Sequence, residues 1–596
     1  MTIGGTQTPT AGQTIPAPPD FPVLWDDPAD AKLIWELSGA VKVPVPLLVD
    51  TVVSAFLVGN NAGFEKAALP FYLRTARVNT YLYLAMVPAE APPEVAMKAM
   101  GLLNRAAPGA FMVVMEKMGA RMSKKAEVAL DALIADFETY WYGELLPEIK
   151  QHIAYFERID LPGLSLEQLR AHLEEALKRT ERMGALHGVV FPMLYAMSQF
   201  EELYCELFEG ATSLGALRLT QGLDNKTMEG NRALWELSRA AESVPEVAAI
   251  LTGQAAGDVI PALEASAAGQ SFLAGLRAWL AEYGRRLDSI SSLTEPSWFE
   301  DPAPAIQSLQ AYLALPGRRP EMDIATLAAE REQAVAEARA KLAHYPRPVV
   351  DRFEALLKAA QVATIVHEDH NFWIDQQLFY HLRQLILEIG HRLVQAGSLD
   401  AVDDVFHLAP AELQDGQNAD LKGLVQQRKA ELERFRQVSP PPKLGTMPPF
   451  AMEGGGPVMR AMFKGEMTAP IKGESAANTV RGFAGSAGVT RGPARVIRSL
   501  AEAGRLQPGD VLVARATQPP WTPLFATAVA VVTDNGGVLS HTAVVAREFR
   551  IPAVVGTGRA TSTFSDGQLL EVDGNAGTVR VMVEVEDSER EPALVG

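Results

Sequence analysis

The feature that most constrains the fold is a change of hydrophobic pattern around a stretch rich in proline and glycine late in the chain. From about Phe21 to Gln437, apolar residues return at three- and four-residue spacing, the period of amphipathic helices. Residues 478–586 instead hold short apolar runs bounded by glycine, which predict strands. The sequence therefore predicts a multidomain protein: a large all-α domain over 21–437 and a small α/β domain over 478–586.

The segments around these domains have a different composition. Residues 438–477 contain Pro-Pro-Pro and Gly-Gly-Gly-Pro clusters, which neither a helix nor a sheet accommodates easily. We interpret them as a linker that could span on the order of 100 Å if fully extended. The alternative is a long ordered loop packed on the helical domain. Residues 1–20 are interpreted as a disordered tail and residues 587–596 as a second tail.

Several helix boundaries can be predicted from local signals. Ser165 and Gln168 form a capping-box pattern, which predicts the start of a helix. Other helices are expected from about Ile324 to Leu342 and from about Thr364 to Ala396. Gly397 then stands where a left-handed C-cap is needed. In the α/β domain one helix is expected, from about His541 to Phe549.

Charge and cysteine content exclude some function classes. The chain has 72 acidic and 54 basic residues, a formal net charge of −18, which disfavours general binding to nucleic acid or to anionic membranes. Its single cysteine, Cys205, cannot form an intrachain disulfide or an all-cysteine metal cluster. The apolar stretch Pro44–Val58 is short and interrupted by Asp50, so no membrane span is expected. We expect a cytoplasmic protein without a nucleic-acid or membrane partner.

The segment Thr533–Glu548 carries the strongest chemical signal. An apolar run ends, Gly536 and Gly537 turn the chain, and Ser540 and His541 fall at the first turn of a helix. Unpaired N–H groups and the helix dipole make such a position suited to an anion such as a phosphoryl group. Histidine is a competent nucleophile near neutral pH. Position alone leaves a structural histidine as an equal alternative.

A resemblance changes that balance. Residues Gly536–Gly556 resemble the phosphohistidine signature of the phosphoenolpyruvate-utilising enzymes. Shorter family-like pieces support it: Ser486–Gly488, Arg491–Val496, Pro520–Pro523 and Asp573-Gly574. The resemblance implies that His541 becomes phosphorylated on a swivelling domain, with Ser540 as a second catalytic residue and with Gly536, Gly537 and Thr542 at the phosphate. Leu539 stands where dikinases usually have a threonine, so regulation by phosphorylation of that threonine is not carried over.

The helical part has a second family-like strip. His367–Trp373, Arg383, Leu387–Gly390 and Asp403–Leu408 are similar to the acceptor-binding region of rifampicin phosphotransferase and of the larger subunit of phenylphosphate synthase. By this resemblance Arg383 is a candidate phosphate clamp facing the phosphohistidine; an ordinary ion pair is the equal alternative.

Four further residues are candidates for binding the acceptor, and one of them for the general base that takes its proton: His367, Glu368, His370 and His381. Metal binding by such a His/Glu cluster is the less favoured interpretation, and no metal site is expected.

What the chain lacks also shapes the functional expectation. It contains no Gly-x-x-x-x-Gly-Lys-[Ser/Thr] loop, and nothing near its start resembles an ATP-grasp domain. The resemblance therefore implies a split dikinase-type phosphotransferase. A separate ATP-grasp subunit would use ATP and Mg²⁺ to place the β-phosphate on His541.

The phosphohistidine would then pass its phosphoryl group to the hydroxyl of a small, phenolic acceptor, as in the breakdown of a phenol. Two alternatives stay open: an antibiotic or other alcohol as acceptor, and a non-catalytic phosphocarrier.

Overall fold

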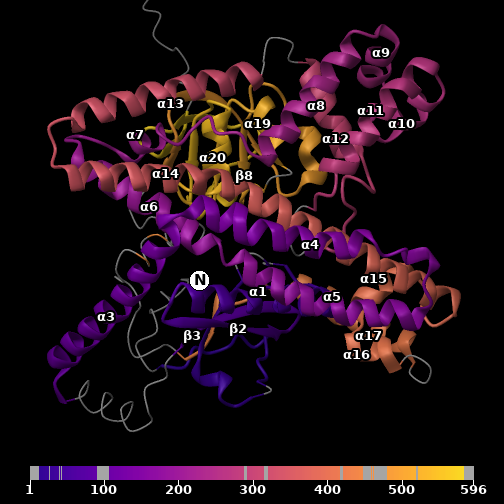
Figure 1. Ribbon diagram of the computed structural model, residues 1–596. Coiled ribbons are helices and arrows are strands. Elements are labelled where there is room, and N and C mark those ends of the chain that lie inside the picture. The colour runs from indigo at the N-terminus through magenta and orange to yellow at the C-terminus, as the bar shows by residue number, and fades with distance from the viewer. Residues whose placement is uncertain are drawn as a thin grey trace, which may run out of the picture.

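The computed structural model describes residues 13–25, 27–38, 41, 43–89, 106–287, 292–314, 320–415, 420–446, 458, 461, 479–518 and 521–582. It confirms the predicted fold class, a mostly helical domain followed by a small α/β domain (Figure 1). The principal helices of the first domain are α1 (Leu47–Lys66), α3 (Pro108–Ala135), α4 (Leu146–Glu157), α5 (Leu166–His187), α6 (Val190–Leu207), α7 (Ser213–Leu217), α8 (Lys226–Glu242), α9 (Pro245–Gly253), α10 (Ala256–Glu264), α11 (Ala267–Tyr283), α12 (Ala303–Ala314), α13 (Pro320–Leu342), α14 (Arg347–His370), α15 (Gln377–Gln395), α16 (Pro410–Asp415) and α17 (Leu421–Arg436).

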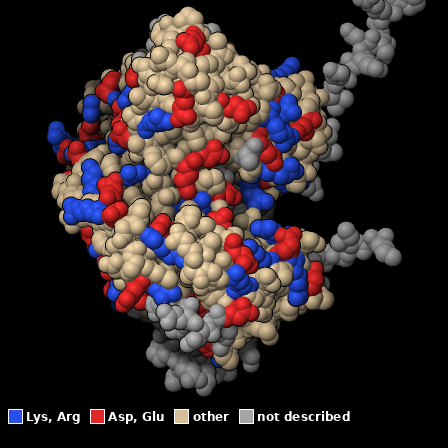
Figure 2. All heavy atoms as spheres, turned by 90° about the vertical axis from the view of Figure 1, so that its right-hand side faces the viewer, with Lys and Arg blue, Asp and Glu red and all other residues tan. Residues whose placement is uncertain are grey.

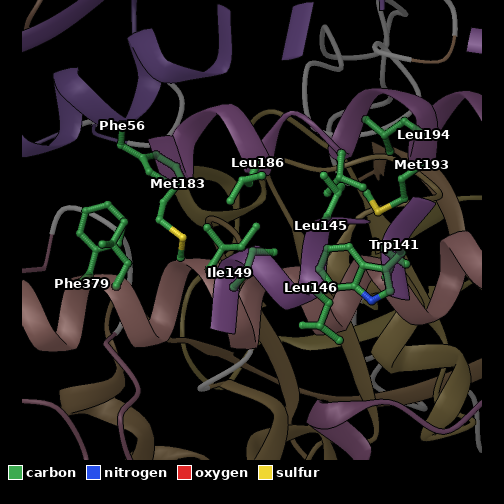
Figure 3. Packing of buried hydrophobic residues seen from close by; sticks show 14 of the residues in the cluster. Phe56, Trp141, Leu145, Leu146, Ile149, Met183, Leu186, Met193, Leu194 and Phe379 are labelled. Carbon is green, nitrogen blue, oxygen red and sulfur yellow. The ribbon is translucent and has the colours of Figure 1, made fainter. Parts of the chain in front are cut away.

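One part of the core of the helical domain lies where α1, α4, α5 and α15 meet. Phe56 of α1, Met183 of α5 and Phe379 of α15 point toward one another (Figure 3), and the rings of Phe56 and Phe379 are 5.3 Å apart, edge to face. Two glycines let α1 and α5 come this close. A Cβ on Gly59 would lie 2.1 Å from the Glu181 carbonyl oxygen, and one on Gly184 would lie 2.1 Å from that of Phe56.

Helix α1 is longer than the apolar stretch Pro44–Val58 suggested. Its 20 residues are long and apolar enough to cross a membrane by length and composition, with a mean hydropathy of 1.4 in the best window. Half of that window is buried inside the protein, which is typical of a core helix.

On the face shown in Figure 2, acidic and basic side chains are interspersed among the described residues.

A four-stranded antiparallel sheet lies in the domain that was predicted to be all helix. Its strands are β1 (Ile34–Leu37), β2 (Phe71–Val78), β3 (Tyr81–Pro88) and β4 (Lys443–Gly445), in the order β2-β3-β1-β4. Asn79 and Thr80 turn the β2–β3 hairpin with φ values of 49° and 72°. The two hairpin strands are eight residues each, and they were missed because the surrounding helical pattern dominates.

Strand β4 lies inside the predicted linker. The Tyr81 hydroxyl donates to the Phe435 and Val438 carbonyls at 3.0 and 3.1 Å, and Ile15 N donates to Gly445 O at 2.8 Å. The start of the 438–477 segment and the end of the predicted 1–20 tail are therefore packed on the sheet, as the ordered-loop alternative has it. The rest of 438–477 lies outside the described residues, apart from Val458 and Ala461, which are buried.

One helical run carries most of the candidate acceptor residues. Helix α14, a π-helical turn η4 (Asn371–Gln376) and α15 follow one another without a break. The run begins at Arg347, well before the predicted Thr364, because Pro346 and not a later residue stands at its N-cap. It ends as predicted, with Gly397 at φ 74°. The capping box of Ser165 and Gln168 is also confirmed.

The C-terminal domain is built on an eight-stranded sheet in the order β5-β12-β11-β7-β8-β9-β10-β6. Strands β7 to β10 are parallel and the flanking strands pair antiparallel. Helices α19 (Thr522–Thr527), α20 (His541–Glu548) and α21 (Ala560–Thr563) accompany the sheet, and the domain lies beside α13 and α14 (Figure 1, yellow). The strands are β5 (Thr479–Arg481), β6 (Phe483–Ser486), β7 (Val489–Val496), β8 (Val511–Ala514), β9 (Ala530–Thr533), β10 (Ala553–Val555), β11 (Leu569–Asp573) and β12 (Thr578–Val581).

Candidate functional site

His541 is the first residue of α20, directly after the turn that follows β9. Gly536 has φ 107°, and a Cβ there would lie 2.8 Å from the Ser540 hydroxyl oxygen, so the turn requires glycine. Ser540 stands at the N-cap, but its hydroxyl donates to the Gly537 carbonyl at 2.8 Å instead of capping the helix. The Thr542 and Thr517 hydroxyls lie 2.8 Å apart. The turn thus fixes where His541 leaves the sheet.

The ring of His541 is held from the other domain. Its Nδ1 lies 3.0 Å from both carboxylate oxygens of Glu368, and its Nε2 lies 3.5 Å from the Thr522 hydroxyl oxygen. Because a carboxylate only accepts, we assign the proton to Nδ1. The lone pair of Nε2 is then available as the nucleophile.

Glu368 is buried as an anion. Besides His541, it accepts hydrogen bonds from the Thr227 hydroxyl at 2.9 Å and from His367 Nδ1 at 3.1 Å. Burial alone would raise its pKa, but the electrostatic attraction and hydrogen bonds of His541 and His367 outweigh burial and hold the pKa well below its usual range. The site therefore presents a fixed negative charge to the imidazole of His541.

The other predicted acceptor residues do not all converge on His541. His367 reaches it through Glu368, and His370 is buried at the end of α14, where its Nδ1 donates to the Val366 carbonyl at 2.8 Å. The ring of His381 stacks on Phe156 with centroids 5.6 Å apart, and Arg285 lies 3.3 Å from its Nε2. Burial and Arg285 lower the pKa of His381 to about 3. His381 is thus a neutral ring packed beside the core.

Arg383 is placed differently from the expected clamp. Its Nε lies 3.1 Å from Glu300 Oε1, and its Nη1 donates to the Leu293 carbonyl at 2.7 Å. The guanidinium is buried in these contacts, which match the ion-pair alternative. Within the described part of the chain, these hydrogen bonds of Arg383 go to Glu300 and Leu293 and not to His541.

A second arginine, which the sequence analysis did not single out, has the surroundings expected of an anion site. Arg286 is 2% exposed and lies 5.9 and 5.7 Å from the rings of Trp279 and Trp298. Its Nε and Nη1 are buried without a hydrogen-bond partner among the described residues, and so are both side-chain polar atoms of Asn231. Burial lowers the pKa of Arg286 to about 10, opposed in part by Tyr283, Tyr312 and Glu368.

The two domains also meet away from His541. The Gly222 amide donates to Glu548 Oε1 at 3.1 Å, and Arg331 donates to the Gly222 carbonyl at 2.6 Å. Arg550 forms an ion pair with Glu330 of α13. One hydrophobic cluster contains residues of both domains, including Trp279, Phe372, Trp521, Phe525 and Val545. The structure thus shows the α/β domain docked on the helical domain, with His541 turned inward.

Two stretches of the chain match known protein domains. Residues 506–577, which include the His541 turn, match the PEP-utilising enzyme mobile domain. This chain carries the mobile domain of the PEP-utilising enzymes. Residues 185–368, which end at Glu368, match the fourth domain of rifampicin phosphotransferase. The mobile domain therefore docks, through His541, on the last residue of that second match.

Relatives of the chain include phosphotransferases and a synthase. It is 39% identical over 588 residues to the chondramide synthase cmdD of Chondromyces crocatus, covering 95% of this chain and 14% of that protein. It is 28% identical over 463 residues to the uncharacterized phosphotransferase YvkC of Bacillus subtilis, covering 74% of this chain and 53% of the relative. It is 28% identical over 365 residues to the rifampicin phosphotransferase of Streptomyces sviceus, covering 60% of this chain and 40% of the relative. The chain thus spans from about a seventh to about half of the length of these relatives.

Proposed function

We propose that this chain is the acceptor-binding and phosphocarrier part of a dikinase-type phosphotransferase. The observation that carries the proposal is the contact between His541 on the mobile domain and the buried carboxylate of Glu368 on the helical domain, at 3.0 Å. The carboxylate holds Nδ1–H and leaves Nε2 to carry the phosphoryl group. A phosphohistidine at this place would meet an acceptor bound on the helical domain.

Loading of His541 needs a source of phosphate. We assign this step to a separate ATP-grasp-type subunit that binds ATP and Mg²⁺ and transfers the β-phosphate to Nε2. The overall reaction is then ATP + acceptor + water giving phospho-acceptor + AMP + phosphate.

Arg286 is our candidate for the group that neutralises the transferred phosphoryl. Phosphoryl transfer depends on positioning and on positive charge around the equatorial oxygens. Arg286 offers two buried donors without a protein partner among the described residues, and Asn231 offers a buried amide. Arg383, whose donors are occupied by Glu300 and Leu293, is the weaker candidate.

The acceptor is proposed to be a small molecule with a phenolic hydroxyl, in the soluble, cytoplasmic setting expected from the sequence. The match of residues 185–368 to the rifampicin phosphotransferase fourth domain favours a second candidate, a larger antibiotic alcohol. Both acceptors would use the same phosphohistidine.

The test combines loading and discharge. The full chain is mixed with a candidate ATP-grasp subunit and ATP labelled at the β-phosphate, and acid-labile, base-stable label is followed on wild type and on His541→Ala. Label on the wild type alone, discharged by phenol or by a rifamycin, supports the proposal and selects the acceptor. Stable label that no hydroxyl compound discharges would favour the phosphocarrier instead. No label, with a folded and ATP-binding partner, would overturn the relay.

A further inference from the structure

Three side chains outside the His541–Glu368 contact converge on one point of the helical domain. His187 is the last residue of α5, His370 is the last residue of α14, and Asp375 lies in the π-helical turn η4. One ligand atom from each of the three lies within 4.8 Å of the others, and His187 Nε2 is 3.8 Å from Asp375 Oδ1. The imidazole rings of His187 and His370 are 5.2 Å apart.

The hydrogen bonds of the two histidines leave the same nitrogen available on each ring. His187 Nδ1 lies 3.0 Å from the Asn60 side-chain oxygen, and His370 Nδ1 lies 2.8 Å from the Val366 carbonyl oxygen. A carbonyl or amide oxygen accepts a proton donor, so Nδ1 carries the hydrogen and Nε2 carries the lone pair. Histidines that bind a metal are commonly oriented in this way by a second hydrogen bond.

The π-helical turn explains how a carboxylate joins the two rings. Residues five apart on an α-helix point about 140° away from each other. The wider turn η4, which begins directly after His370, brings Asp375 back toward the side of His370. Asn371 of the same turn donates to Asp375 Oδ2 at 3.2 Å, and Gln376 donates to Asn371 Oδ1 at 2.9 Å. Each of the three side chains is thus oriented by a neighbour.

We propose that His187, His370 and Asp375 bind one divalent transition-metal ion of the Zn²⁺, Mn²⁺ or Fe²⁺ class. Two imidazoles and one carboxylate suit such ions, and three protein ligands leave coordination positions open. Ligand atoms around a tetrahedral ion lie about 3.4 Å apart when each bond is about 2.1 Å. The three side chains therefore need only a small inward movement to close on the ion.

The position of this site suggests its use, and this step rests on the proposed function. The ring of His370 lies 6.1 Å from that of His367, which contacts Glu368, which in turn contacts His541. An acceptor hydroxyl bound at an open position would lose its proton to water more easily. Because Glu368 faces Nδ1, the mobile domain would have to turn so that Nε2 faces the ion. The acceptor oxygen would then form the new O–P bond as the Nε2–P bond breaks, and that electron pair would stay on Nε2.

Metal binding is tested on the full chain without any need for activity. The protein is stripped with a chelator, equilibrated separately with Zn²⁺, Mn²⁺ or Co²⁺, freed of unbound ion, and analysed by plasma mass spectrometry. We expect about one ion per chain for wild type and none for His370→Ala or Asp375→Ala. Asn60→Ala keeps all three ligands, and we expect its affinity to fall by about 10–100-fold.

The control is His407→Gln, a buried histidine distant in sequence from all three ligands, which should keep the ion. Circular dichroism checks that each variant is folded. The proposal is overturned if the wild type retains no ion, or if His370→Ala and Asp375→Ala retain as much as the wild type. Loading of His541 is measured separately on metal-free protein, so a failed relay and a missing metal site give different results.

Discussion

At the scale of single residues, the contact of His541 with Glu368 has two properties that matter for phosphoryl transfer. The carboxylate is buried and anionic, so its interaction with the imidazole is poorly screened by water. It also lies on the domain that would bind the acceptor. The orientation of the nucleophile is therefore set by docking and not by the mobile domain alone.

Replacement of Glu368 by glutamine tests this role. The amide can still accept from Nδ1–H, but it carries no charge to hold the imidazole proton. We expect discharge of phosphorylated protein to an acceptor to slow by about 10²-fold or more, while loading by the ATP-grasp subunit stays within a small factor. Single-turnover discharge measures the first rate. Equal discharge by wild type and Glu368→Gln would remove Glu368 from the transfer step.

The two buried arginines give a matched comparison. Arg286→Lys removes a planar donor from the site we assign to the phosphoryl group, so we expect acceptor discharge to fall by about 10²-fold. Arg383→Lys disturbs an ion pair with Glu300 and should lower the midpoint of thermal unfolding more than the transfer rate. The assignment is reversed if discharge is impaired in Arg383→Lys and normal in Arg286→Lys.

The sequence made parts of this site predictable and left others hidden. His541 was recognisable because residues Gly536–Gly556 resemble a known phosphohistidine signature; the glycine turn at a helix start alone left a structural histidine as an equal alternative. The His367–His370 cluster was recognisable as a group, but which member meets His541 depends on the phase of α14 and on how the domains dock. Arg286 belongs to no sequence pattern, because its burial beside Trp279 and Trp298 is visible only in the fold.

At the scale of the elements, the close crossing of α1 and α5 is what brings His187 to the site. The two helices touch through glycines, because a Cβ on either Gly59 or Gly184 would meet a backbone carbonyl of the other helix. Because neither glycine has a side chain, the backbones of α1 and α5 can approach each other closely. The α5 terminus, with His187, is then positioned by this contact.

Gly59→Ala should therefore destabilise the helical domain. The added methyl group would lie 2.1 Å from the Glu181 carbonyl oxygen, so the helices must move apart. We expect a loss of about 1–3 kcal/mol in the free energy of unfolding, measured by urea denaturation. Gly257→Ala is the control: Gly257 lies in α10 with open space around its Cβ, and alanine there should be neutral or stabilise by up to about 1 kcal/mol. Similar changes in both variants would contradict this account of the crossing.

Helix ends and the presence of strands were predictable because their patterns are local. The capping box at Ser165 and the cap at Gly397 follow from patterns within a few residues. The glycine-bounded apolar runs of residues 478–586 likewise predicted strands there. Strand β4 could not be found in the same way, since Lys443–Gly445 becomes a strand only by pairing with β1, about 400 residues earlier. The π-helical turn η4 likewise could not be predicted, because no characteristic amino-acid pattern marks such a turn.

At the scale of the whole molecule, Glu548 of the mobile domain is buried where its carboxylate accepts a hydrogen bond from the Gly222 amide of the helical domain. Burial raises its pKa from 4.5 to about 7, although the Gly222 amide and Arg547 act in the opposite direction. Below about pH 4.5 this group is protonated whether the domain is docked or free. Above pH 7 the docked form must bury an anion that the free form keeps in water. Docking is therefore favoured at low pH and weakens as pH rises through about 7.

Small-angle X-ray scattering can follow this change. We expect the radius of gyration of the wild type to be larger at pH 8 than at pH 6, as a greater fraction of mobile domains leaves the helical domain. Glu548→Gln, which stays neutral, should remain compact at both values. A wild type whose radius is the same at pH 6 and pH 8 would show that Glu548 does not govern docking.

The partners of Glu368 have a consequence for repeated turnover. Thr227 and His367 come from the same domain as Glu368, so both stay with it when His541 departs. A buried carboxylate that lost every partner would cost about 3–5 kcal/mol, and departure would be slow for that reason. Here Glu368 keeps its hydrogen bonds from Thr227 and His367, so the surface that binds His541 keeps its shape after the mobile domain leaves. Under the proposed function, the helical domain would therefore release a dephosphorylated His541 and receive a rephosphorylated one without rebuilding its binding surface in every cycle.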